Sequence, residues 1–547
     1  MKKTLSVFLS LFLLLSVLSG CGGTEAQSAA PAEAEVGSPY PIAQLTIGTT
    51  MSIEKAVRDE YNYDMLASSA TELPLLRQDV SGHYLPLLCD FSTEDSVTWT
   101  YTLKDGLLWD DGEAVTAEDI LFTLEYEDAA GTANFNDKTD AEGKTAAAKY
   151  SGYELSEDGR SISLTLAEPN VREPGNMVSF RIMPRHIYEG KDSVTEAESR
   201  IGCGPYVFES FNREAGSVSF TANPNFPEQP HVGRLVFRLF GSEDTMYMAL
   251  RSGDIDLVWN YSSGVPANYA EVLGETVKLT SVSAANVPAV LAFNNARGFF
   301  AEEELRLAVS CALDYEQFRT LFGSEHSLTP GRGFAPATTL GYIDTPELAR
   351  DPAAAENHMR AAGYEKNENG FFEKNGAEAA FTLSYNAEKE VHSGCAELIK
   401  TQLENFGIRV TLEGLDKDSY NAKTSNKFSE NNITMEAALY GFTAAGMGMG
   451  SGLGSIYVDG SHAVQGGCQV FGEEFAAVKQ ALDGAKSVEE YYDAAAQLQT
   501  YYAEHCPLLA LYWDNLLYAC SDRLDNVTAD AIFGLNNAVN WMTLTEE

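Results

Sequence analysis

The sequence has 547 residues, of which 79 are acidic and 37 basic, giving a formal net charge of −42. Nucleic acid and anionic lipid surfaces are poor partners for so acidic a chain, because their charge repels it. The length exceeds what one simple hydrophobic core takes, so we expect two or three lobes.

The N-terminus has the pattern of a secretory signal. Lys2 and Lys3 precede an apolar run from Leu5 to Leu18. This run is shorter than the roughly 20 residues that a membrane-spanning helix needs, and no later segment approaches that length. We therefore expect residues 1–20 to be a signal peptide.

The sequence Leu18-Ser-Gly-Cys21 resembles the bacterial lipobox, in which cleavage occurs before the cysteine and a diacylglyceryl group is attached to its sulfur. The resemblance predicts Cys21 as the lipidation site. Residues 21–40 are rich in Gly, Ala, Ser, Glu and Pro, which is typical of a flexible tether. The alternative is an ordinary cleaved signal followed by an unmodified cysteine.

Seven cysteines remain after Cys21. An odd number does not make a disulfide framework, and most are interpreted as small buried hydrophobic residues. Cys506 and Cys520 flank a predicted hairpin, so a bond between them stays open at this point.

Strand and turn patterns dominate the first half of the chain. Residues 45–51 are β-prone, and apolar and polar residues alternate over residues 97–103, which predicts strands. Thr116 is placed to cap a helix with acidic residues in its first turn. Residues 206–208 and 218–220 predict a β-hairpin.

Strands alternate with helices in the second half. The apolar run of residues 287–294 precedes a helix whose buried face includes Leu305 and Val309. Residues 381–385 lead into a second helix, which ends at Gly407 and is followed by the alternating strand of residues 408–412. Such β-α-β units predict a partly parallel sheet.

Near the C-terminus, Ser487 begins a capping box and predicts a helix start. The apolar runs Leu508–Trp513 and Leu516–Cys520 predict a closing hairpin around Asp514 and Asn515. The β-prone residues at both ends of the chain suggest that these ends meet in one lobe.

The longest motif is Trp99-Thr-Tyr-Thr-Leu-Lys-Asp-Gly-Leu-Leu-Trp-Asp-Asp-Gly-Glu-Ala-Val-Thr-Ala-Glu-Asp-Ile120. It resembles the signature of the family 5 extracellular solute-binding proteins, the oligopeptide, dipeptide and nickel-binding class of ABC importers. Further segments follow in the family's order: Met183-Pro-Arg-His186, Ile201-Gly-Cys-Gly-Pro-Tyr206, Asn223-Pro-Asn-Phe226, Leu250-Arg-Ser-Gly-Asp-Ile-Asp256, Ala292-Phe-Asn-Asn295 and Ala396 to Val410. The resemblance covers nearly the whole chain after the signal.

This resemblance implies an α/β fold, periplasmic-binding-protein-like and two-lobed, with an additional subdomain in the first lobe. The expected organisation is a lobe I core of residues 41–75, 200–285 and 507–547, a lobe I subdomain of residues 76–199, and a lobe II of residues 286–506. One ligand is expected between the lobes, which hinge shut around it.

The implied function is that of a substrate-binding lipoprotein, which captures a peptide or other small solute and delivers it to an ABC permease. The implied partners are this ligand and the permease and ATPase subunits, with membrane contact through the lipid anchor only and no nucleic acid. The expected location is the extracellular face of the bacterial cell membrane or the periplasm. We expect a monomer without a cofactor.

Ligands of α/β lobes meet the loops at the carboxyl ends of strands, so residues at such ends are the candidates for the site. Aromatic rings there offer flat apolar walls, and asparagine both donates and accepts hydrogen bonds. Each position is equally compatible with an ordinary core or surface role. The candidate ligand-binding residues are Thr50, Met51, Trp259, Asn260, Tyr261, Asn294, Phe442, Thr443 and Met447.

One feature departs from the family's pattern. Peptide-binding members usually place an acidic residue after the strand equivalent to residues 436–442, where it pairs with the peptide's ammonium group. Here residues 443–452 are rich in Gly, Ala and Met, and no carboxylate follows until Asp459. Asp254 or Asp459 would have to take that role, so the ligand class stays open between peptide, peptide-like or opine-like amine, metal chelate and glycan. The acidic balance favours a cationic solute.

The thioethers of Met447 and Met449 are soft ligands suited to Cu(I), and also adaptable contacts for apolar solutes. No His or Cys lies close in sequence to complete a metal site, so we expect a Met-bearing loop and no bound metal.

Two other functions compete with transport. An extracellular hydrolase would need a catalytic constellation, but G-x-S-x-G and H-E-x-x-H are absent and the eight histidines are scattered singly. We therefore expect no enzymatic activity. A ligand-sensing or adhesive surface lipoprotein without an importer shares every sequence feature described above.

Overall fold

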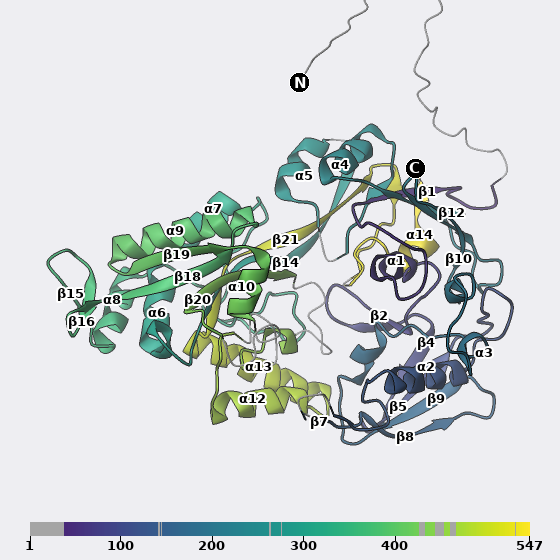
Figure 1. Cartoon of the computed structure of the whole chain (residues 1–547), viewed down its shortest axis with the longest axis horizontal. Coiled ribbons are helices and arrows are strands. Elements are labelled where there is room, and N and C mark those ends of the chain that lie inside the picture. Colours follow the sequence, from purple (N-terminus) through teal and green to yellow (C-terminus); the bar gives the residue numbers. More distant parts are fainter. Residues whose placement is uncertain are drawn as a thin grey trace, which may run out of the picture. The chain divides into compact units, whose positions relative to one another are not determined.

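The fold of Pro39–Glu547, one compact unit in the computed structural model, is organised around a mixed sheet of ten strands (Figure 1). In sheet order these are β10 (Tyr206–Asn212), β11 (Ser217–Ala222), β12 (Arg234–Leu239), β1 (Leu45–Thr49), β13 (Leu257–Val258), β21 (Leu508–Ser521), β14 (Val277–Phe293), β20 (Ala437–Thr443), β18 (Ala380–Asn386) and β19 (Arg409–Leu415).

The structure describes residues 38–139, 143, 145–261, 264–274, 276–425, 433–443, 453–459, 467–530 and 532–546. Within these ranges, every helix is too short or too polar to cross a lipid bilayer. Cys21 and Met447 lie outside the described residues, as do the predicted signal peptide and most of the predicted tether.

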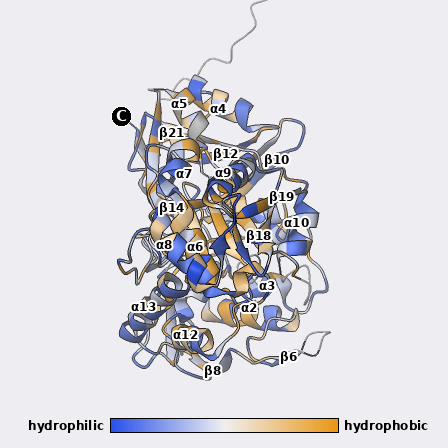
Figure 2. Cartoon of the chain, turned by 90° about the vertical axis from the view of Figure 1, so that its left-hand side faces the viewer, coloured by the Kyte–Doolittle hydropathy of each residue, from blue (hydrophilic) through white to orange (hydrophobic). Residues whose placement is uncertain are grey.

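Thirteen α-helices are described, and Figure 2 shows the outer ones, such as α10 and α13, as largely hydrophilic. Their bounds are α1 (Tyr61–Ala67), α2 (Ala117–Ala129), α3 (Arg185–Tyr188), α4 (Glu243–Ser252), α5 (Ala267–Leu273), α6 (Glu303–Ala312), α7 (Tyr315–Phe322), α8 (Pro352–Ala361), α9 (Glu390–Phe406), α10 (Lys417–Thr424), α12 (Glu473–Asp483), α13 (Val488–His505) and α14 (Ala538–Thr543). Short 3-10 turns are η1 (Glu173–Met177), η2 (Glu198–Arg200), η3 (Phe299–Ala301) and η4 (Leu453–Ile456).

The predicted β-α-β unit is confirmed. Strand β18 pairs in parallel with β19, and α9 connects the two. Gly407 ends α9 in the left-handed region, with φ at +116°, where a side chain would be strained. Strands β12, β1 and β13 also run parallel to one another, while β14 and β21 are antiparallel. The sheet is therefore partly parallel, as the sequence predicts.

The second sheet has four antiparallel strands in the order β4 (Cys89–Ser92), β5 (Thr98–Leu103), β9 (Ser161–Leu166) and β8 (Tyr150–Leu155). The alternation over residues 97–103 is confirmed, since Trp99, Tyr101 and Leu103 are buried in β5. Thr116 caps α2 in a capping box with Asp119. Small ladders complete the strands: β2 (Leu76–Gln78) with β3 (Tyr84–Pro86), β6 (Lys138–Thr139) with β7 (Thr145–Ala146), β15 (Glu365–Lys366) with β16 (Phe372–Lys374) and β17 (Ala377–Glu378), and β22 (Leu524–Asp525) with β23 (Thr545–Glu546).

The predicted hairpin around Asp514 and Asn515 is wrong, because β21 runs through both residues as one strand. The Asp514 carboxylate accepts hydrogen bonds from the backbone N–H of Ser324, at 2.9 Å, and from its hydroxyl. The Asn515 amide donates to the hydroxyl of Ser281 on β14. The two polar residues therefore bond to neighbouring segments, and no turn is needed to expose them.

A bond between Cys506 and Cys520 is excluded by the same observation. Cys506 lies two residues before β21 and Cys520 lies near the far end of that strand, so the strand length, at about 3.3 Å per residue, separates them far beyond disulfide reach. The cysteines that the structure describes are all buried free thiols, as the sequence predicts.

The lobe boundaries stay predictions. Strand β14 begins in the predicted lobe I core and ends in the predicted lobe II, so the change from one to the other falls within a strand. This part of β14 is irregular, since its register against β21 shifts between Val282 and Asn286 and again between Asn286 and Ala289.

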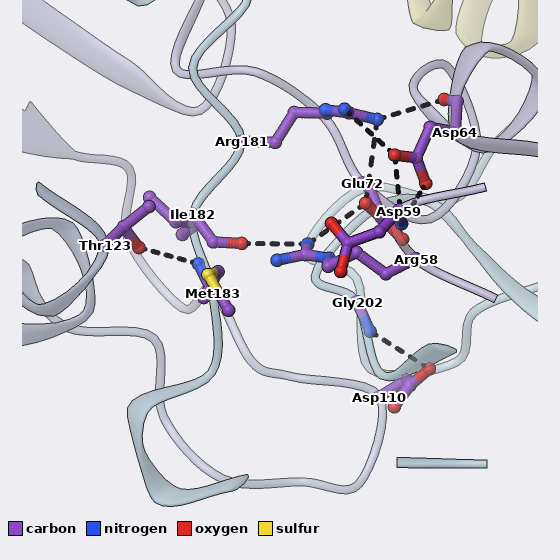
Figure 3. Close-up of polar contacts among 10 residues, drawn as sticks. All are labelled: Arg58, Asp59, Asp64, Glu72, Asp110, Thr123, Arg181, Ile182, Met183 and Gly202. Carbon is purple, nitrogen blue, oxygen red and sulfur yellow. Dashed lines mark hydrogen bonds and ion pairs between the residues drawn. The ribbon is translucent and has the colours of Figure 1, made fainter. Parts of the chain in front are cut away.

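A buried cluster of charges ties the segment around α1 to the chain that follows η1 (Figure 3). Arg58 lies 3.0 Å from Glu72 and donates a 3.2 Å hydrogen bond to the carbonyl of Ile182. Arg181 donates to the carbonyl of Asp64 at 3.1 Å and lies 3.4 Å from its carboxylate. Buried charges of this kind require their partners, because removing one leaves the other uncompensated.

Two glycines of the Ile201-Gly-Cys-Gly-Pro-Tyr206 motif permit a close backbone approach in the same region. A Cβ atom at Gly202 would lie 2.0 Å from the carbonyl oxygen of Thr71, and one at Gly204 would lie 2.1 Å from that of Ala70. The Gly204 N–H donates to the carbonyl of Thr71. Glycine is required at both positions because a side chain would displace the backbone that carries Glu72.

Asp64 gives this cluster a testable pH dependence. Burial raises the pKa of the Asp64 carboxyl to about 6, and the nearby Glu72 carboxylate adds to the rise. In the unfolded chain the pKa of an aspartate is about 3.9, so between roughly pH 4 and 6 the folded state holds the extra proton and is favoured as the pH falls. We expect the wild type to gain about 1 kcal/mol in free energy of unfolding relative to Asp64→Asn when the pH goes from 7.5 to 5.

Urea unfolding of both proteins at the two pH values measures this difference. Asp90→Asn, which removes an exposed carboxylate outside this cluster, is the control. A wild-type advantage over Asp64→Asn that is independent of pH would contradict the assignment.

Candidate ligand-binding site

Two of the predicted ligand-binding segments lie side by side at the carboxyl ends of parallel strands. Strand β1 pairs with β13 in parallel register, Ile47 with Leu257 and Gly48 with Val258. The chain leaves these strands at the same edge, so residues 49–51 and residues 259–261 are neighbours. A strand-end position of this kind is where α/β sheets bind ligands.

Asn260 joins the two segments. Its side-chain oxygen accepts hydrogen bonds from the Thr49 hydroxyl at 2.9 Å, the Thr50 N–H at 2.9 Å and the Thr50 hydroxyl at 3.2 Å. The Thr49 hydroxyl accepts in turn from the Met51 N–H at 3.1 Å. Among the described residues, the amide nitrogen of the half-buried Asn260 has no hydrogen-bond partner, so its two N–H groups are not used within this part of the chain.

Aromatic side chains surround this junction. The indole N–H of the buried Trp259 donates to the carbonyl of Phe533 at 2.6 Å, which fixes its ring. The ring of Tyr261 lies 6.1 Å from that of Phe533 and 6.2 Å from that of Tyr61. Tyr261 is half-buried and Tyr61 is 61% exposed, so both present ring surface to solvent. Such rings are suited to pack against apolar parts of a ligand.

Met51 completes the junction. Its sulfur accepts the Tyr261 N–H at 3.4 Å, and its side chain packs against the core below β1. The predicted residues Thr50, Met51, Trp259, Asn260 and Tyr261 are thus brought together. Sequence reasoning missed Tyr61 and Phe533, because neither follows a predicted strand and only the tertiary fold brings them here.

The predicted residues on β20 lie on another part of the same sheet. Phe442 is half-buried, and its ring lies 5.9 Å from that of Phe334 and 6.3 Å from that of Tyr440. In the backbone ladder, Thr443 pairs with Asn286 on β14. Asn286 also pairs with Asp514 on β21, so the carboxyl end of β20 reaches the irregular middle of the β14–β21 pair.

The chain after Tyr261 approaches the same stretch of β21 from the other side. The Val265 N–H donates to the carbonyl of Leu517 at 2.7 Å. Asp514, which pairs with Asn286 on β14, is three residues before Leu517 on β21. The two groups of predicted ligand residues therefore border one short stretch of the shared sheet.

Asn294 occupies a different place. It is fully buried, its amide donates to the carbonyl of Met435 at 3.0 Å, and its side-chain oxygen accepts from the Ala296 N–H at 3.1 Å. It follows the end of β14 where Phe293 pairs with Ala437, the opposite end of β20 from Phe442. The structure does not bring Asn294 together with the other candidates.

Candidate acids for an ammonium group are scarce at the junction. Asp254 is exposed, accepts a hydrogen bond from Ser252 at 2.7 Å, and precedes β13, at the end opposite to Asn260. No group of three or more His, Cys, Asp or Glu side chains with metal-binding geometry occurs in the described part of the chain. The polar side chains described at the junction are neutral: the Thr49 and Thr50 hydroxyls, the Asn260 amide and the Tyr61 and Tyr261 hydroxyls.

Comparison with known proteins identifies the family. The model of the bacterial extracellular solute-binding proteins, family 5, matches residues 69–453. The chain belongs to this family. Its role is that of the substrate-binding component of an ABC importer.

Characterised relatives have different ligands. The chain is 24% identical over 372 residues to the nickel-binding periplasmic protein of Escherichia coli K12, covering 66% of this chain and 68% of the relative. It is 22% identical over 453 residues to the oligopeptide-binding protein AppA of Bacillus subtilis, covering 75% and 76%. The solved structure of the ABC transporter substrate-binding protein CtaP of Listeria monocytogenes superposes with a TM-score of 0.74 at 19% identity, over 92% of this chain and 99% of that one. The last similarity confirms the periplasmic-binding-protein-like α/β fold.

The three-way hydrogen bonding of Asn260 predicts how substitutions act. Asn260→Ala removes the acceptor of one backbone N–H and two hydroxyls, and we expect it to lower the free energy of unfolding by about 2 kcal/mol. Asn260→Asp keeps the acceptor oxygen but loses the free N–H donors, so we expect the free energy of unfolding to stay within about 1 kcal/mol of the wild type.

Denaturant unfolding of the two variants measures the contrast. Thr50→Val, which removes only one of the three donors, is the graded control and should lie between wild type and Asn260→Ala. Equal stability of Asn260→Ala and the wild type would show that Asn260 does not join the two segments.

Proposed function

We propose that the chain captures one peptide-sized solute at the junction of residues 49–51 with residues 259–261, closes its two lobes around it, and presents it to an ABC permease. The observation that carries this proposal is the Asn260 amide. Its oxygen accepts hydrogen bonds from Thr49 and Thr50, which join both strand ends, and its nitrogen has no hydrogen-bond partner among the described residues. Tyr261 follows it in the chain, and the Tyr261 ring contacts that of Tyr61. Neutral donors next to aromatic walls suit the amide groups and side chains of a short peptide.

A metal chelate is the second candidate ligand. It is supported by the similarity to the nickel-binding periplasmic protein of Escherichia coli K12. Because the described residues supply no group of metal ligands, a metal would have to arrive with its own chelator. The chelator would then meet the same hydroxyl and amide groups as a peptide.

The remaining features extend the proposal. Cys21 is proposed as the lipid-anchored N-terminus, which would keep a monomer close to its permease on the outer face of the cell membrane. Residues 76–199 are proposed as a subdomain of lobe I, and residues 286–506 as lobe II. We propose no covalent chemistry, which is supported by the binding roles of the relatives.

A thermal-shift screen tests the ligand class. The chain from residue 39 onward is mixed with dipeptides to pentapeptides, amino-acid derivatives, nickel and iron chelates, and oligosaccharides. We expect peptides to raise the melting temperature in proportion to dose, because ligand at about 100 times its dissociation constant adds roughly 2.7 kcal/mol to the stability of the native state.

Tyr261→Ala should reduce the peptide-induced shift, while Tyr492→Ala, at an exposed position on α13, should not. A shift from chelates alone would support the second candidate in place of the first. If every class leaves the melting temperature unchanged, or if Tyr261→Ala binds as well as the wild type, the proposed site is wrong.

A further inference from the structure

Val171 and Arg172 connect two parts of the fold that the main sheet does not join. They lie between β9 and η1, within the proposed subdomain of residues 76–199. Nevertheless, the Val171 N–H donates to the carbonyl of Ala485 at 3.1 Å. The Val171 side chain is 6% exposed and belongs to a hydrophobic cluster otherwise formed by residues 287–513, including Tyr457 and Leu482.

An ion pair with several partners lies beside this contact. A guanidinium nitrogen of Arg172 lies 2.6 Å from the carboxylate of Asp483, the last residue of α12. The same carboxylate accepts from the Tyr457 hydroxyl at 2.9 Å and pairs with Lys479 at 2.9 Å. Arg172 is 16% exposed and Asp483 39% exposed, so the pair is partly shielded from water. Burial raises the pKa of Asp483, but the hydrogen bonds from Lys479 and Arg172 outweigh it and hold the pKa below its ordinary value.

The two parts repel each other electrostatically elsewhere. Residues 76–199 carry 25 acidic and 10 basic side chains, and residues 286–506 carry 31 and 16, so each has a formal net charge of −15. Like net charges disfavour close approach of two bodies. A cation from one that enters a carboxylate site of the other supplies a local attraction where the general field is repulsive.

The geometry points to a latch for the lobes. We propose that Val171 and Arg172 hold residues 76–199 against α12 and η4 when the lobes are closed, and leave this site when the lobes open about the irregular middle of β14 and β21. The inference rests on the proposed lobe closure, and it deepens it by naming the residues that set the closed fraction. The latch acts without touching the ligand.

The strength of the latch sets how binding and closure are coupled. A ligand shifts an open–closed equilibrium only by its difference in affinity for the two states. A latch that is too strong closes the empty protein and blocks ligand entry. With a weaker latch the empty protein is mostly open, and ligand binding then produces a larger increase in the closed fraction. A partly exposed ion pair of moderate strength, opposed by net repulsion, gives an equilibrium that a small solute is able to shift.

Distance measurements between spin labels test the latch without any ligand. The labels are placed at Glu157→Cys, in the turn between β8 and β9, and at Glu489→Cys, in the first turn of α13, both at exposed positions. The described native cysteines are buried, so they do not compete for label. In the chain from residue 39 onward we expect a short-distance population, and we expect Arg172→Ala to reduce the ratio of short to long distances about fivefold.

Asp483→Ala should reduce this ratio similarly, and the double variant should reduce it no further than either single one, because both remove one interaction. Raising salt from about 0.05 M to 1 M shortens the screening length to about 3 Å and weakens the general repulsion in both proteins, but it weakens the ion pair in the wild type alone. The difference in the ratio of short to long distances between the wild type and Arg172→Ala should therefore shrink at high salt. Lys191→Ala breaks an exposed ion pair to Glu198 inside the subdomain and should leave the distances unchanged.

The proposal is overturned if Arg172→Ala has the wild-type distance distribution, or if the effects of Arg172→Ala and Asp483→Ala add. Circular dichroism monitors folding, and Arg172→Gln, which keeps a long polar side chain, replaces Arg172→Ala if that variant unfolds. Since no ligand is present, a failed ligand screen and a failed latch are separate outcomes.

Discussion

Two long strands, β14 and β21, pair antiparallel from Val277 opposite Ser521 to Ala292 opposite Leu508, and the other eight strands of the ten-stranded sheet extend from this pair. Strand β13 adds to one end of β21, and β20 adds to the far end of β14. Hydrogen bonds between strands are spaced by the backbone, so any segment joined to this ladder has a fixed register. Thr49 and Phe442, far apart in sequence, therefore belong to one sheet.

In the middle of this strand pair, the backbone register is irregular but side-chain hydrogen bonds hold the strands in place. The register of β14 against β21 shifts on both sides of Asn286, and bulges of this kind bend and twist strands. At the same place, Asp514 is held by Ser324 and Asn515 by Ser281. A bend of this kind, held by side-chain hydrogen bonds but without a regular backbone ladder, is a suitable position for a hinge. A small change of backbone angles there would rotate the parts of the sheet on its two sides relative to each other.

Different interactions have different roles around this proposed hinge. The buried charges of Arg58, Glu72, Arg181 and Asp64 join segments within one proposed lobe, where loss of a partner is costly and permanence is useful. The Arg172–Asp483 pair joins segments of two proposed lobes and is less buried. The Asn260 hydrogen bonds fix the strand ends without using the amide donors. In the proposed closure, the strong contacts hold each lobe together and the weaker pair between the lobes is the one that breaks.

Local patterns predicted the local structure well. The Thr116 and Ser487 caps, the stop at Gly407 and the alternation in β5 depend on neighbours within a few residues, which the sequence displays directly. Long-range partners were not visible. Asp514 and Asn515 have the composition of a turn, but in the fold they bond to Ser324 and Ser281. Asn294 has a side chain suited to a ligand, but it donates its amide N–H to the carbonyl of Met435. Tyr61 and Phe533 reach the site only through tertiary packing with Tyr261.

The central claim is that residues on both sides of the β14–β21 hinge act as one ligand site. Amide hydrogen exchange, followed by mass spectrometry with and without the solute that stabilises the chain most, tests it directly. The account predicts that the ligand slows exchange in residues 49–51, 259–261 and 437–443 together. Protection confined to one side of the hinge, or found only in segments distant from Asn260, would contradict it.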